Sequence, residues 1–138
     1  IRWFQSLSVV LILSGNKFFM EDFLSDCIFC GIISGNVSAD VLFDGGDTLF
    51  FKDLHPKAAV HILGIPKKHL TSLDPMVGDD HLMIGKLLHD ATHVARDAGI
   101  FESGYRIITN VGTHAGQEIP HLHFHILGGE PLGPLRCS

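Results

Sequence analysis

Residues 120–129 read Pro-His-Leu-His-Phe-His-Ile-Leu-Gly-Gly, and this stretch decides the fold and the chemistry that we expect. Side chains alternate between the two faces of a β-strand, so the pattern predicts a strand over residues 122–127. His121, His123 and His125 then lie on one face. Neighbours on one face stand about 6.5 to 7 Å apart, so each imidazole can reach a different part of one phosphodiester-sized substrate. The alternative is a solvated strand face that is rich in histidine by chance.

The loop before this strand suits a phosphate ligand. Residues 110–118 hold two glycines and several polar side chains, a composition that can point backbone N–H groups at phosphate oxygens. An imidazole can act as a nucleophile or as a general acid or base, because its unperturbed pKa is about 6.5. The loop and the three in-phase histidines together indicate chemistry at a phosphate.

The rest of the chain predicts an α+β fold. We expect a short helix over residues 27–34 with Asp26 as its N-cap, and a long helix over residues 79–98. The apolar stripe of the long helix comprises Ile84, Leu87, Leu88, Ala91, Val94, Ala95 and Ala98. The runs that predict strands are residues 41–43, 48–52, 61–65, 105–109 and 122–127. This order favours a mostly antiparallel five-stranded sheet with the long helix laid over one face.

Length and composition limit the class of protein. The 138 residues suit one domain, and the formal charge of -5 argues against broad contact with duplex nucleic acid. Residues 1–19 lack an initiator Met, and their apolar run is too short to span a membrane. We expect them to be a leader or upstream translation, and Met20 to begin the domain over residues 20–138. Three cysteines are too few for a secreted disulfide framework, so we expect a cytoplasmic protein.

The segment His121 to Leu127 resembles the signature of the histidine triad family. The resemblance extends from about Cys27 to Pro134 and includes the segments 50–53, 61–69, 104–106 and 116–117. Gly128-Gly129, followed by residues 131–134, is similar to the Hint branch of purine nucleoside phosphoramidases. The branch of dinucleoside polyphosphate hydrolases usually has a Pro-Arg pair there instead. The resemblance implies a homodimer whose two sheets join into one and whose C-terminal tail, residues 129–138, reaches the partner's site.

The resemblance also implies a covalent mechanism. His123 would attack the α-phosphorus of a nucleoside 5'-phosphoramidate and form a nucleotidyl-histidine intermediate. His125 would help to protonate the leaving amine, and His61 would be a supporting donor. No metal would take part in the chemistry. The open alternatives are a non-catalytic nucleotide-binding or zinc-binding interaction module and a dinucleoside polyphosphate hydrolase.

The same resemblance assigns residues to the nucleotide. Asp53 would meet the ribose hydroxyls with Leu54 beside it. The residues expected to line the phosphate are Asn110, Gly116, Gln117 and Glu118, and those expected to enclose the purine are Phe29, Ile32, Val37 and Phe51. The purine set has an equally good interpretation as ordinary core. Glu118 departs from the family, because many members have Ser there, and a carboxylate could weaken anion binding or change the preferred leaving group.

Cys27-x-x-Cys30 has the spacing of half a structural zinc site. In some relatives two histidines complete such a site, and the matching positions here are His69 and His121. With zinc bound, His121 would be structural, and only His123 and the last histidine of the triad would remain for chemistry. The alternative is that the two cysteines are small core residues and that His121 is a polar contact beside the phosphate.

Overall fold

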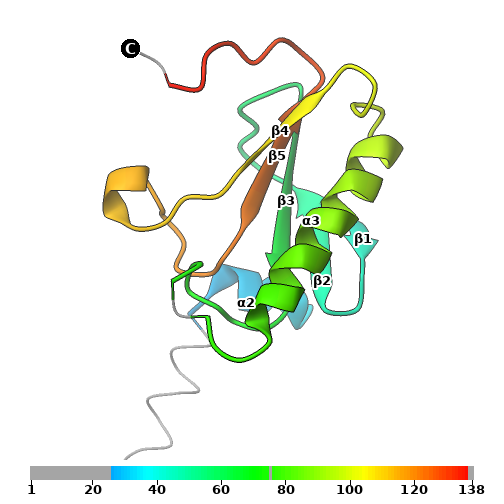
Figure 1. Ribbon diagram of the computed structural model, residues 1–138. Coiled ribbons are helices and arrows are strands. Elements are labelled where there is room, and N and C mark those ends of the chain that lie inside the picture. Colours follow the sequence, from blue (N-terminus) through cyan, green and yellow to red (C-terminus); the bar gives the residue numbers. More distant parts are fainter. Residues whose placement is uncertain (1–25, 75, 137–138) are drawn as a thin grey trace, which may run out of the picture.

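The structure is a computed structural model that describes residues 26–74 and 76–136 (Figure 1). The expected leader, residues 1–19, and the expected start at Met20 lie outside the described residues. Neither helix of the described part is long and apolar enough to cross a membrane.

The fold is one five-stranded antiparallel sheet with a long helix and a short helix, which confirms the expected fold class. The strands are β1 (Val41–Asp44), β2 (Thr48–Lys52), β3 (Val60–Pro66), β4 (Tyr105–Ile108) and β5 (Phe124–Gly128). Their order across the sheet is β1-β2-β3-β5-β4, and every neighbouring pair is antiparallel. Strand β5 contains His125 and directly follows His123. It lies inside the sheet, between β3 and β4.

The two helices pack on opposite faces of the sheet. Helix α3 (Asp80–Asp97) covers β2 and β3 on one face, where Phe50, Ile62 and Ile126 complete the core (Figure 1). Helix α2 (Ile28–Ile33) packs on the other face, against side chains of β2 and β3 that alternate with the first set. The triad histidines lie on this second face, so α2 is the helix that borders their site.

The stripe of α3 is confirmed except at Leu88. Leu87, Ala91, Val94 and Ala95 are buried, whereas Leu88 is 39% exposed. Successive helical residues are about 100° apart, so a side chain next to Leu87 points past the edge of the contact with the sheet. The helix ends where expected, at the C-cap Ala98.

Two other boundaries were predicted wrongly. Helix α2 has Cys27 rather than Asp26 as its N-cap, and Cys27 makes no side-chain capping bond. Strand β5 begins at Phe124 rather than at residue 122. Pro66, at the end of the neighbouring strand, has no N–H to offer the ladder, and the N–H of Leu122 donates to the carbonyl of Leu70 instead. His121 and His123 therefore precede the regular strand.

Candidate active site and metal centre

A cavity of about 690 Å³ opens on the α2 face of the sheet. His61, His123 and His125 all line it, so the structure brings together the three residues expected to be catalytic. The residues expected at the nucleotide that also line it are Phe29, Ile32, Val37, Phe51, Asp53, Leu54, Asn110, Gly116 and Glu118. The sequence analysis missed His55 and Lys57, which lie in the loop between β2 and β3 and also line the cavity. The one feature of the sequence that could have indicated these two residues is their position, because both closely follow Asp53.

Gln117 is not among the residues that line this cavity; instead it holds the loop of residues 110–118 in place. Its side-chain N–H groups donate to the carbonyls of Thr71 (2.6 Å) and Ile119 (3.1 Å). Its side-chain oxygen accepts from the N–H of Gly112 at 3.0 Å. Gly112 and Gly116 have positive φ angles of 75° and 77°, where a glycine avoids the strain of a side chain. Gln117 therefore fixes the path of the loop on which Gly116 approaches the cavity.

His123 is held with one nitrogen free. Its Nδ1 donates to the carbonyl of His121 at 2.6 Å, because a carbonyl oxygen can only accept. A neutral imidazole has one N–H, so Nε2 keeps a lone pair. The ring is 6% exposed and packs edge-on against Phe29, with ring centres 5.3 Å apart. A lone pair on a fixed ring beside a cavity is chemically capable of nucleophilic attack.

His61 and His125 form a hydrogen-bonded pair beside it. His61 Nε2 lies 2.9 Å from His125 Nδ1 and 3.4 Å from the Oδ2 of Asp53. Burial, and to a lesser degree the neighbouring His123 and His61, lower the pKa of His125 to about 4, although the carboxylate of Asp53 acts in the opposite direction. Burial also lowers the pKa of His61. Both rings are therefore neutral near pH 7, and each has one N–H to donate.

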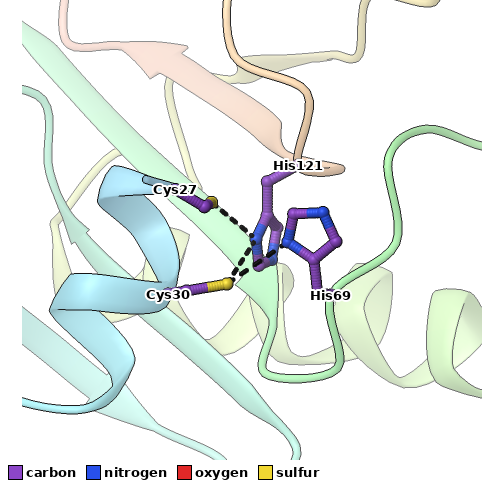
Figure 2. Close-up of side chains that lie close together, drawn as sticks. All are labelled: Cys27, Cys30, His69 and His121. Atoms are coloured by element: carbon purple, nitrogen blue, oxygen red, sulfur yellow. Dashed lines mark hydrogen bonds between the residues drawn. The ribbon is translucent and has the colours of Figure 1, made fainter. Parts of the chain in front are cut away.

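Cys27, Cys30, His69 and His121 form a second cluster, in which all four expected metal ligands converge (Figure 2). The Nδ1 of His121 lies 3.4 Å from the Sγ of Cys27 and 3.7 Å from that of Cys30. The Nδ1 of His69 lies 3.2 Å from the Sγ of Cys30. His121 is fully buried, faces the two sulfurs and is not among the residues that line the cavity, which favours the metal-ligand interpretation over a contact beside a phosphate.

This geometry fits a tetrahedral metal ion. Zn–S bonds of about 2.3 Å and Zn–N bonds of about 2.0 to 2.1 Å put a sulfur and a nitrogen ligand about 3.5 Å apart. The three distances above lie close to this value. The Nε2 of His121 donates to the carbonyl of Pro66 at 2.9 Å, which leaves the Nδ1 lone pair facing the sulfurs, as metal-bound histidines require. The Nε2 of His69 is buried with no hydrogen-bond partner among the described residues, so this ring is held less firmly.

The comparisons with known proteins agree with this geometry. The HIT domain family matches residues 34–132. The chain belongs to the HIT family. A purine nucleoside phosphoramidase of Escherichia coli K12 is 36% identical over 110 residues, which cover 80% of this chain and 92% of the relative. An uncharacterized HIT-like protein of Synechocystis is 43% identical over 107 residues, which cover 78% of this chain and 93% of the relative.

Solved HIT structures share the fold. A HIT family hydrolase from Clostridium thermocellum has a TM-score of 0.78 and 39% identity, and the match covers 80% of this chain and 96% of that one. A histidine triad protein from Clostridium difficile has a TM-score of 0.77 and 36% identity, with the same coverage of 80% and 96%. The sheet with its two helices is therefore the HIT fold, and hydrolases occur among its similar structures.

Proposed function

We propose that this HIT protein hydrolyses nucleoside 5'-phosphoramidates and related nucleotidyl conjugates through a covalent intermediate on His123. The observation that carries the proposal is the state of the His123 ring. Its Nδ1 is hydrogen-bonded to the backbone carbonyl of His121, which leaves Nε2 with a lone pair. The E. coli relative named a purine nucleoside phosphoramidase supports the substrate class.

The reaction takes two displacements. In the first, His123 Nε2 forms a bond to the α-phosphorus, the P–N bond of the substrate breaks, and the leaving amine takes a proton from His125. In the second, water attacks phosphorus and gives one proton back to His125, and the P–Nε2 bond breaks, which releases the nucleoside monophosphate and the free imidazole of His123. Splitting one hard displacement into two easier ones is the advantage of covalent catalysis. His61 supports His125 through the 2.9 Å hydrogen bond.

The residues that line the cavity are assigned to three parts of the substrate, namely the ribose, the purine and the phosphate. We assign the ribose to Asp53 and Leu54, and the purine to the apolar end of the cavity at Phe29, Ile32, Val37 and Phe51. We assign the phosphate to Asn110, Gly116 and Glu118, which also line the cavity. We infer that the HIT domain acts as a cytoplasmic homodimer.

The Cys27, Cys30, His69 and His121 cluster is proposed to bind one structural Zn²⁺. A bound zinc ion would cross-link the segments that hold its ligands, which are far apart in sequence. Through His121 it would anchor the chain just before His123. His121 would then serve structure rather than chemistry, and catalysis would need no metal.

The test is turnover of adenosine 5'-monophosphoramidate by the full chain, by His123→Ala and by His89→Ala. His89 is an exposed histidine on α3 and serves as the matched control. We expect the parent and His89→Ala to turn over alike, and His123→Ala to lose at least about 1,000-fold, as enzymes do when they lose a nucleophile. Mass spectrometry of the rapidly quenched parent should show a nucleotidyl adduct on His123.

Other outcomes select the rival functions. Nucleotide binding without turnover in any of the three proteins would support a binding module. A kcat/KM that is higher for a dinucleoside polyphosphate than for the phosphoramidate would support the other hydrolase class. Equal turnover by the parent and His123→Ala would refute the covalent mechanism.

A further inference from the structure

Three hydrogen bonds donated by backbone N–H groups of the loop between β2 and β3 hold His61 and the neighbouring Asp53. The N–H of Lys57 donates to His61 Nδ1 at 3.0 Å. The N–H of Asp53 donates to the carbonyl of His61 at 3.0 Å, and the N–H of His55 donates to the Oδ1 of Asp53 at 2.7 Å. The loop therefore holds both the ring of His61 and the carboxylate beside it.

The bond from Lys57 decides where the proton of His61 lies. A backbone N–H can only donate, so His61 Nδ1 must be the accepting, unprotonated nitrogen. The single proton of the neutral ring is then on Nε2. His61 is 6% exposed, so water cannot readily replace this backbone contact.

The proton on His61 in turn fixes the state of His125. Two acceptors face His61 Nε2, and the nearer is His125 Nδ1 at 2.9 Å, against 3.4 Å for the Oδ2 of Asp53. His125 Nδ1 therefore accepts, and its own proton is on Nε2. His125 lines the cavity, and Nε2 is the ring nitrogen that the bond to His61 leaves available for a ligand there.

We propose that the backbone N–H of Lys57 is a tautomer lock, which acts through His61 to hold His125 as an Nε2–H donor. His123 is locked in the opposite tautomer, by the carbonyl of His121. One ring therefore offers a lone pair and the next offers a proton, which are the two roles that phosphoryl transfer to histidine needs. This catalytic consequence rests on the proposed function, whereas the tautomers themselves do not.

The tautomer lock also explains why the two candidate metal clusters should differ in their ability to bind a metal ion. Asp53, His61 and His125 have ligand atoms within 4.8 Å of one another, as the cysteine-histidine cluster does. A metal ligand must be a nitrogen without a proton, and His61 Nε2 carries one as long as Lys57 donates to Nδ1. We therefore interpret His61 and His125 as a hydrogen-bonded pair rather than as metal ligands. The metal ion is expected at the other cluster, in which His121 Nδ1 has no proton.

The tautomers can be read directly from two-bond ¹⁵N–¹H correlation spectra of the full chain labelled with ¹⁵N-histidine, at pH 7.5. We expect His61 and His125 to show the Nε2–H pattern and His123 the Nδ1–H pattern, with assignments from single His→Gln variants. Lys57→Pro removes the N–H, and Lys57→Ala is the matched control that keeps it. The control should leave all three patterns unchanged, whereas Lys57→Pro should give His61 a mixture of tautomers.

Activity gives the second readout. One neutral hydrogen bond is worth about 0.5 to 1.5 kcal/mol, so Lys57→Pro should lower kcat about 2- to 10-fold relative to Lys57→Ala with KM unchanged. An Nδ1–H pattern for His61 or His125 in the parent would overturn the proposal, even if Lys57→Pro fails to fold. Identical spectra for the two Lys57 variants would overturn it as well. If the parent shows the expected tautomers without phosphoramidase activity, the proposed function fails and the lock stands.

Discussion

Removal of the metal is the perturbation that tests the cysteine-histidine cluster most directly. We expect the purified protein to hold one Zn²⁺ per chain, and a strong chelator to remove it and lower the thermal midpoint. Cys30→Ser, which nearly preserves side-chain volume but replaces a thiolate ligand, should have the same effect without chelator. His89→Ala removes a histidine from the exposed face of α3 and should behave like the parent.

The magnitude follows from mass action. A ligand present at about 1,000 times its dissociation constant stabilises the folded state by about 4 kcal/mol. Each kcal/mol shifts the midpoint of a domain of about 100 residues by about 4 °C, so chelation should lower Tm by about 15 °C. The structure makes a large effect reasonable, because the four ligands come from α2 and its N-cap, from the segment after β3 and from the segment before β5.

Calorimetry with and without chelator measures the shift, and Co²⁺ replacement reports the ligand geometry. A tetrahedral site with two thiolates gives Co²⁺ an intense visible absorption, which Cys30→Ser should weaken and His89→Ala should not. The reasoning fails if chelation leaves Tm within about 2 °C of its starting value. It also fails if Cys30→Ser and the parent give the same Co²⁺ spectrum.

Three further predictions concern packing, a buried carboxylate and pH. Gly64→Ala should destabilise the protein by about 1 to 3 kcal/mol or more, because its Cβ would lie within 3.0 Å of two ring atoms of Phe50. Gly85→Ala, with nothing within 4 Å, should instead stabilise α3 by about 1 kcal/mol, and urea denaturation compares the two. Asp90→Ala should lower the free energy of unfolding by about 1 to 3 kcal/mol in the same assay. The substitution removes the carboxylate that accepts hydrogen bonds of 2.6 Å from the buried hydroxyl of Thr48 and from Lys86. The folded state lowers the pKa of His125 from 6.5 to about 4, so it binds fewer protons than the unfolded state and stability should fall as pH drops from about 6.5 to 4. His125 should contribute about 1 to 3 kcal/mol to that fall, and a slope that is unchanged in His125→Ala would contradict this assignment.

Local patterns predicted most of the fold, for a physical reason that can be seen in α3 and β5. Spacing of three and four residues is a property of the helix itself, so the stripe that includes Leu87 and Ala91 could be read before any contact was known. Alternation is likewise a property of the strand, and it placed His123 and His125 on the same face. Apart from Leu88 in the middle of α3, the errors fell at boundaries, where a neighbouring segment rather than the local pattern decides. The late start of β5 reflects the missing N–H of Pro66 on the adjacent strand.

The sequence by itself determined the identities of the reactive groups: the triad histidines, the paired cysteines and the acidic residue at position 53. Their meeting was expected only from resemblance, since Cys27 and His121 are 94 residues apart in sequence and 3.4 Å apart in space.

What only the tertiary structure decided is the state of each ring. A histidine carries its proton on whichever nitrogen faces an acceptor, and here the partners are the carbonyls of Pro66 and His121 and the N–H of Lys57. Backbone groups are the same in every residue but proline. No pattern of side chains can therefore tell which of them will face an imidazole until the chain has folded.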